Sequence, residues 1–412
     1  PVQNYINQLK LSPSYGLAGN DRFYNDDGSQ KRFAYITTIG TTDGYKWGNS
    51  NAFYDKGGLR EGDPGVESLT WETVKKANVG IELGLFKMAE LQVDFFHERR
   101  EDIFMQRKNI PSSAGFPSAP WANYGIVTNK GFDISLDLNK QINKDWFISA
   151  RASVTYAKNK IIEQDEDLGV LGTYRSSTGK PVGQIFGLVN DGLYTEADFE
   201  DVTTGKLKPG LPVPKFSDRV YPGDIKYLDL NGDNEITETD KTVIGGTVNP
   251  ELVYGFGINL SYKNIDFGAF FQGNGRTYRI IGENQKNFLP GSTIGAEGNI
   301  FTNASDAWTV DNPSQDVFYP RLHMGYNANN AQVSDWWLKD MSMLRLKNVE
   351  LGYSFSKNLI KKAAMEYARI FVRGTNLLQF SKFDLWDPEL NTSNGLKYPI
   401  MATYSIGLQV RF

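Results

Sequence analysis

The feature that most constrains this chain is a long alternation of apolar and polar residues, WFISARASVTY, at 146–156. Every second residue of this run is apolar, and an aromatic residue stands at each end of the row, at Trp146 and Tyr156. Period two predicts a β-strand with two different faces. At about 3.3 Å per residue, its ten steps span roughly 33 Å, or roughly 23 Å of height when tilted by about 45°. This height matches the apolar band of a membrane-spanning barrel strand, which is about 25 Å tall and bordered by aromatic residues.

The same alternation recurs along the chain, and we expect about ten strands in all. Two neighbouring rows, 252–262 and 265–272, are joined by Lys263 and Asn264, which predicts a hairpin with a two-residue turn. In 343–355 the apolar positions change phase, which predicts a bulge near Lys347 and Asn348. The other rows lie at 78–86, 90–98, 131–139, 368–378 and 403–412.

Long polar segments, chiefly 160–250, 273–341 and 380–400, separate some of these strands. Short turns that alternate with long loops are typical of outer-membrane barrels. Mean hydropathy is −0.43, and no run approaches the roughly 20 apolar residues of a transmembrane helix. A soluble β-sandwich, whose strands also alternate, is the alternative. The net charge of −4 comes without a basic run, which argues against nucleic acid as a partner, and the absence of Cys removes disulfides and thiolate metal sites.

Residues for catalysis are scarce, and we expect no enzyme activity. The chain has two histidines, and the HERRE run at 97–101 lacks the second His of a zinc-protease helix and alternates as a strand. No nucleophile elbow and no phosphate-binding loop occur. We interpret acidic pairs such as Asp165 and Glu166 as solvated loop residues.

Aromatic residues are frequent outside the clearest strands. Such rings could stack on sugars, or they could pack the long loops together or against a partner protein. The sequence leaves both interpretations open and assigns no substrate contact. The residues concerned are Trp308, Phe318, Tyr319, Trp336, Trp337 and Trp386.

The segment DLNGDNEITETD at 229–240 predicts a calcium site. An EF-hand-like loop supplies oxygens at positions 1, 3, 5, 7, 9 and 12. Two departures weaken the match: position 6 is Asn234 where Gly is usual, and position 12 is the short Asp240 where Glu is usual. An Asx-rich turn without an ion is the alternative. The predicted Ca²⁺ ligands are Asp229, Asn231, Asp233, the Glu235 carbonyl, Thr237 through water, and Asp240.

Several segments, in order, resemble the SusC/RagA-like family of TonB-dependent outer-membrane transporters. They are PSYGLAGND, LTWETVKKANVGIELGLF, NYGIVTNKGFDISLDL, PVGQIFGLVNDGLY, PGDIKYLDLNGDNEIT, DWWLKDMSMLRLKNVELGYSF and YPIMATYSIGLQVRF. The resemblance implies an all-β fold, a transmembrane antiparallel β-barrel with long extracellular loops. Members of the family have an N-terminal plug domain and a barrel of 22 strands. Residues 1–412 are therefore expected to be the C-terminal portion of such a barrel, with the plug and first strands outside this chain.

The resemblance also implies a function, a location and partners. We expect import of nutrient oligomers across the outer membrane, glycans more than peptides, with a SusD-like surface lipoprotein as lid. Energy would come through TonB, which would contact the absent plug region, and the barrel would meet outer-membrane lipids. A calcium-binding surface adhesin or another secreted β-sandwich is the alternative. The terminal apolar row resembles the signal that outer-membrane assembly machinery reads; it comprises Tyr404, Ile406, Leu408, Val410 and Phe412.

Overall fold

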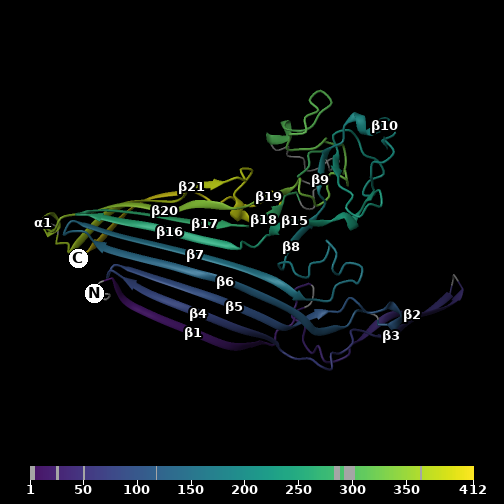
Figure 1. The fold of residues 1–412 in the computed structure, drawn as a ribbon, viewed down its shortest axis with the longest axis horizontal. Coiled ribbons are helices and arrows are strands. Elements are labelled where there is room, and N and C mark those ends of the chain that lie inside the picture. The colour runs from purple at the N-terminus through teal and green to yellow at the C-terminus, as the bar shows by residue number, and fades with distance from the viewer. Residues whose placement is uncertain are drawn as a thin grey trace.

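The computed structural model describes residues 5–24, 27–49, 52–116, 118–282, 288–291, 302–361 and 364–412. Ten long strands form one antiparallel sheet, and each strand pairs with its sequence neighbours among the ten (Figure 1). In order across the sheet they are β1 (Ile6–Asn20), β4 (Glu72–Leu85), β5 (Ala89–Gln106), β6 (Trp121–Gln141), β7 (Trp146–Glu163), β16 (Leu252–Tyr262), β17 (Ile265–Gly275), β20 (Met343–Ser354), β21 (Tyr367–Ser381) and β22 (Thr403–Arg411).

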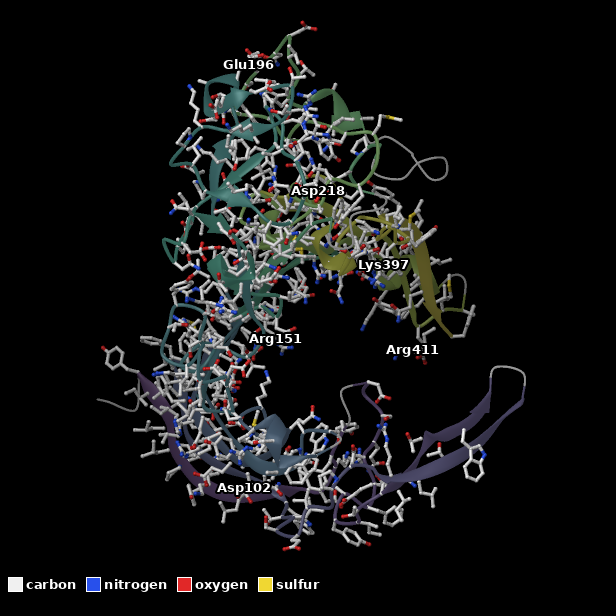
Figure 2. All side chains as sticks on the ribbon, turned by 90° about the vertical axis from the view of Figure 1, so that its right-hand side faces the viewer. Asp102, Arg151, Glu196, Asp218, Lys397 and Arg411 are labelled. Carbon is white, nitrogen blue, oxygen red and sulfur yellow. The ribbon has the colours of Figure 1, made fainter. Side chains whose placement is uncertain are left out.

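The sheet curves into an open arc, and Arg151 points toward its hollow side (Figure 2). The strands at the two ends of the arc, β1 and β22, each pair on one edge only within the described residues. A single curved sheet of ten strands replaces the two packed sheets of a sandwich, so the sandwich alternative is wrong. The concave surface of the arc is called the inner face below, and the convex surface the outer face.

The alternation of the sequence sorts side chains between these two faces. On the outer face, aromatic rings of neighbouring strands pack together: Phe256 and Phe271 stack at 5.1 Å, and Trp146 and Tyr262 lie 4.5 Å apart at the turn end. The row from Trp146 to Tyr156 lies on this face, as predicted. Because the rows of β7, β16 and β17 are in register, their outer side chains form one continuous apolar surface.

The connections confirm two local predictions. Tyr262 pairs with Ile265, so Lys263 and Asn264 form the expected two-residue turn. The register of β20 shifts between Leu346 and Asn348, which confirms the predicted bulge. The short turns and the four-residue helix α1 (Lys357–Ile360) lie at one end of the sheet, and the long loops lie at the other (Figure 1).

Three strands near the start of the chain escaped sequence analysis: β1, and the ribbon of β2 (Ile39–Asn49) and β3 (Ala52–Glu61). Pro13 and two glycines break the β1 segment, and Pro is rare inside sheets. Pro13 nevertheless lies within the ladder, in register with Val79 of β4.

Long loops between the sheet strands fold into a body with its own core, which we call the loop body (Figure 1). Within the described part of the chain, no helix is long and apolar enough to cross a membrane. The short strands of the loop body are β8 (Gln184–Gly187), β9 (Asn190–Leu193), β10 (Phe199–Asp201), β11 (Lys206–Leu207), β12 (Val213–Pro214), β13 (Ile225–Tyr227), β14 (Glu235–Ile236), β15 (Thr242–Thr247), β18 (Tyr278–Ile280) and β19 (Leu338–Asp340).

Candidate functional site

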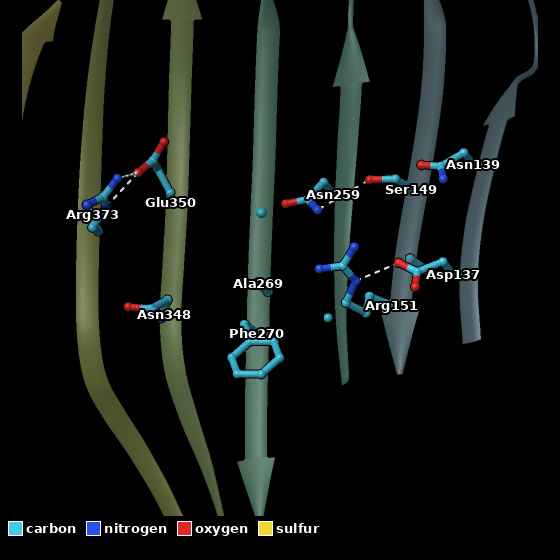
Figure 3. Close-up of a pocket in the computed structure, with 13 residues that line it drawn as sticks. Asp137, Asn139, Ser149, Arg151, Asn259, Ala269, Phe270, Asn348, Glu350 and Arg373 are labelled. Carbon is cyan, nitrogen blue, oxygen red and sulfur yellow. Dashed lines mark hydrogen bonds and ion pairs between the residues drawn. The ribbon is translucent and has the colours of Figure 1, made fainter. Parts of the chain in front are cut away.

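A hollow of about 620 Å³ lies on the inner face, in the half of the sheet near the short turns (Figure 3). Six neighbouring strands, from β6 to β21, supply its side chains. Because side chains alternate along each strand, most of the residues that line it lie opposite the apolar outer rows. The lining is mainly polar and comprises Asp137, Asn139, Ser149, Ala150, Arg151, Gly257, Asn259, Gly268, Ala269, Phe270, Asn348, Glu350 and Arg373.

The charged side chains of the hollow are paired across neighbouring strands. Arg151 Nε lies 2.5 Å from Asp137 Oδ1, and Arg373 lies 2.6 Å from Glu350 (Figure 3). Arg369, beside the hollow, lies 2.6 Å from the same glutamate. Among the charged lining residues, two acids balance two arginines. The hollow therefore offers hydrogen-bonding groups, and the charges of its lining residues cancel.

An aromatic ring interrupts this polar wall. Phe270, 37% exposed, lies beside Gly255 and Gly257 of the neighbouring strand. A Cβ added at Gly257 would lie 3.0 Å from the Phe270 ring, so glycine lets the ring lie close to the wall. Such a ring, bordered by Asn259 and Asn348, offers an apolar surface among hydrogen-bonding groups.

The loop aromatics named in the sequence analysis form the core of the loop body. Tyr319 and Trp337 are fully buried and Trp308 is 6% exposed, while the other three are partly buried against this core. Packing therefore accounts for the three buried rings, which are not free to stack on a ligand. The alternating strand pattern could not reveal this core because its residues come from loops distant in sequence.

A buried polar cluster around Asp224 was missed by sequence analysis. Asp224 Oδ1 lies 2.5 Å from His323 Nε2 and accepts hydrogen bonds from the side chains of Asn327 and Asn330, at 3.1 and 2.9 Å. Its Oδ2 accepts the backbone N–H of Tyr221 at 2.8 Å. The carboxyl is fully buried, and it joins segments about 100 residues apart in the chain. We assign it a structural role in the loop body.

The predicted calcium loop forms a compact turn. Asp229 accepts the backbone N–H groups of Gly232 and Asn234, at 2.7 and 2.8 Å. Asn234 has φ 63°, the left-handed conformation expected of position 6. Asp240 is fully buried, and its oxygens accept the backbone N–H groups of Leu230 and Thr237.

The donor set of this loop is oxygen-rich, as Ca²⁺ requires, but its acids do not all converge. Asn231 donates 2.8 and 2.9 Å hydrogen bonds to Asp233 and Thr239. No group of three or more His, Cys, Asp or Glu side chains poised to hold a metal ion occurs among the described residues. Amide and carbonyl oxygens would therefore have to complete any ion shell.

Asp165 and Glu166 contradict the interpretation as solvated loop residues. They are 5% and 7% exposed, and both carboxyls hold neighbouring segments together. Asp165 lies 2.8 Å from Arg107 Nε and accepts the backbone N–H of Lys108 at 2.7 Å. Glu166 accepts hydrogen bonds from 176–178, including the Ser176 hydroxyl at 2.6 Å. The two acids therefore join neighbouring loop segments, and we call this pair the clasp. The sequence could not reveal it, because a solvated acid and an acid that joins two segments have the same local pattern.

This clasp should weaken in acid. Burial alone would raise the pKa of Glu166, but hydrogen bonds from Ser176, Ser177 and Thr178 outweigh it and lower that pKa from about 4.5 to about 2. The pKa of Asp165 is lowered in the same way. A lowered folded-state pKa gives stability that is present above pH 4.5 and is lost as the pH falls toward 2. Pepsin cleavage within 164–178 should therefore rise over this range.

Two variants test this explanation. In Glu166→Gln, cleavage should already be raised at pH 4.5 and depend less on pH, whereas Asp167→Asn should behave like the parent protein. Equal pH profiles for the parent and Glu166→Gln would contradict the role of Glu166.

Comparison with known proteins identifies what kind of sheet this is. No protein-family model matches the sequence. TonB-dependent receptor P26 of Formosa agariphila is 29% identical over 100% of this chain and 40% of its own length. TonB-dependent receptor SusC of Bacteroides thetaiotaomicron is 22% identical over 99% of this chain and 38% of its own length. The solved RagAB peptide importer in its open-open state matches 99% of this chain and 40% of its own, with TM-score 0.68 and 24% identity.

The chain is SusC/RagA-like. The predicted fold class, a transmembrane antiparallel β-barrel with long extracellular loops, is confirmed, as is its location in the cell outer membrane. The outer face of this SusC/RagA-like sheet thus meets lipid, and the inner face lines the lumen. The chain spans about 40% of the length of the curated relatives P26 and P3.

Proposed function

We propose that this chain forms part of the barrel wall of a TonB-dependent importer of nutrient oligomers. The observation that carries the proposal is the two-sided curved sheet, apolar toward lipid and polar toward the hollow, together with relatives named as TonB-dependent receptors. Those relatives are named as receptors rather than enzymes, in keeping with the expectation of no enzyme activity.

Glycans are the proposed cargo in preference to peptides. Asn139, Ser149 and Asn259 present amide and hydroxyl groups that can exchange hydrogen bonds with sugar hydroxyls, and the Phe270 ring offers an apolar surface. Uptake of fluorescent oligosaccharides and of fluorescent peptides into cells that express the full-length protein tests this choice. Sugar uptake that disappears when TonB is deleted supports it, and peptide uptake alone contradicts it.

The proposed partners follow from the family resemblance. A SusD-like surface lipoprotein would cap the loop body, and TonB would act through a plug region outside this chain. The terminal row from Tyr404 to Phe412 is proposed as the assembly signal. Its exposed side chains, 75% for Tyr404 and 80% for Phe412, lie beside the edge of β22 that has no partner strand among the described residues.

The edges of β1 and β22 that have no partner strand among the described residues give a direct prediction. Unpaired backbone groups within lipid cost several kcal/mol each, so additional strands must pair with both edges. Mass spectrometry of the purified complex should find residues 1–412 continuous with, or bound to, a polypeptide that supplies those strands and the plug. A closed, conducting pore made by residues 1–412 alone would contradict this prediction.

Calcium at 229–240 is a further proposal, in which the ion braces an extracellular loop. Calcium should slow hydrogen exchange in 224–245 relative to EDTA in the full-length protein, and Asp229→Ala with Asp233→Ala should remove this difference. Glu235→Ala is the control because the proposed ligand there is the backbone carbonyl, while its side chain pairs with Lys215 at 2.8 Å. Identical exchange with calcium and with EDTA would rule the ion out.

A further inference from the structure

Lys339 is a partly buried cation in β19 of the loop body. Its Nζ donates a hydrogen bond to the carbonyl of Trp336 at 3.2 Å and lies 5.4 Å from the centre of the Phe318 ring. Among the described residues, no ion pair joins this nitrogen to a carboxylate. The lysine therefore has one carbonyl acceptor and a ring face as partners.

Lys339 is removed from water only in part, and it has no acid partner among the described residues. Buried lysines are almost always paired with an acid, because removing the ammonium group from water is costly. Burial lowers the pKa of Lys339, and no acid among the described residues opposes this shift. An ammonium group has three donors, so two remain for another acceptor.

A small cavity of about 270 Å³ adjoins this lysine. It lies between β19, Phe318 and the segment that follows β21. Phe383, 5% exposed, and Leu338 give it an apolar lining, while Lys382 is exposed beside them. Its lining residues are Phe318, Leu338, Lys339, Asp340, Lys382, Phe383, Asp384 and Leu385, and we call it the Lys339 pocket.

We propose that the Lys339 pocket binds a single carboxylate group on the oligomer that the transporter carries. The carboxylate would accept hydrogen bonds from Lys339 Nζ and lie near Lys382, while the rings of Phe318 and Phe383 contact the apolar part of the same unit. The cargo would then include an acidic unit, either a uronic acid sugar or an acidic amino acid. That the bound molecule is transported cargo rests on the proposed function, whereas its binding to the pocket does not.

The two acids of the pocket set a limit on this ligand. Asp340 accepts the backbone N–H of Ser342 at 2.9 Å, and Asp384 is exposed. Their charges repel a second anion, so one carboxylate should bind better than a polyanion.

Calorimetry on the full-length protein with its lipoprotein, in detergent, tests the pocket. The probes are a trisaccharide with one galacturonate unit and its neutral methyl ester, and the capped peptides acetyl-Ala-Glu-Ala-amide and acetyl-Ala-Gln-Ala-amide. In whichever pair binds, the acid should bind at least tenfold tighter than its neutral counterpart. Sugar binding identifies a uronate source, and peptide binding an acidic residue.

Variants connect this preference to the lysine. Lys339→Gln should raise the Kd of the acidic probe at least tenfold, and Lys339→Arg should keep it within about threefold of the parent value. Lys226→Gln is the matched control: this lysine of the loop body has a 22% exposed side chain, but it is paired with Asp191 at 2.9 Å. It should leave the Kd unchanged.

Three results would overturn the proposal: equal affinity for acid and neutral probes, an unchanged Kd in Lys339→Gln, or equal losses in Lys339→Gln and Lys226→Gln. TonB-dependent uptake is scored separately. Binding that depends on Lys339 without uptake would refute the proposed import function and leave the pocket standing. Uptake without Lys339-dependent binding would refute the pocket and leave the proposed import function standing.

Discussion

Replacing Ala152 with Arg should lower the free energy of unfolding of the barrel by about 2 to 4 kcal/mol. Ala152 lies near the middle of the outer row from Trp146 to Tyr156, and its register partners are Leu136 and Phe256. An Arg there would place a cation among apolar side chains near the bilayer midplane. Urea unfolding of the full-length protein from lipid vesicles measures this loss, and less protein should reach the heat-resistant folded form in the outer membrane.

The next residue provides the control. Ser153 faces the lumen and is paired with Ser135 and Gly255. Ser153→Arg should change the free energy of unfolding by less than about 1 kcal/mol, because water solvates that face. Equal losses for the two variants would show that these faces do not differ in their exposure to lipid.

Removing Arg345 should have a comparable effect on the loop that follows β21. Arg345 is 3% exposed on β20, and its guanidinium lies 2.5 Å from Asp387 Oδ1. Its Nε is 2.9 Å from Glu389 Oε2, at an angle unsuited to a hydrogen bond, so this contact is mainly Coulombic. Breaking a buried ion pair by removing one partner costs about 3 to 5 kcal/mol. Because the side chains of Asp387 and Glu389 stay 12% and 22% exposed, we expect a loss of at most about 3 kcal/mol here. Arg345→Met should therefore release segment 382–398, seen as faster hydrogen exchange.

Lys347 serves as the matched comparison because it contacts the same loop. Its Nζ lies 3.4 Å from Glu389 and its side chain is 27% exposed. Lys347→Met should cost less than about 1 kcal/mol, as expected for a partly exposed pair. If segment 382–398 exchanges at the same rate in Arg345→Met as in the parent protein, the loop is held by other contacts.

The strands of the sheet could be predicted because period two is a local signal. Alternation placed β7, β16 and β17 on their correct faces, and a change of phase located the bulge of β20. The ribbon of β2 and β3 was missed because its strands carry glycines and polar residues on both faces. Alternation reveals a strand only where one of its faces is apolar, and the strands of this ribbon have no such face.

The candidate sites were less predictable because they depend on contacts between distant segments. The polar rows that line the hollow follow from alternation, but the pairing of Arg151 with Asp137 depends on strand register. The burial of Asp165 and Asp224 depends on loops that approach each other only in the fold. Lys339 gave no local signal, since a lysine in a polar segment resembles any solvated lysine.

The central claim is that this chain is a barrel wall with one face toward lipid and the other toward a water-filled lumen. The chain contains no Cys, so single cysteines at 146–156 can carry nitroxide spin labels once cysteines elsewhere in the protein are replaced. Accessibility to oxygen and to a water-soluble nickel chelate should then alternate. Oxygen should reach even positions best and the nickel chelate odd positions. Equal accessibility to the nickel chelate at successive positions would contradict the account.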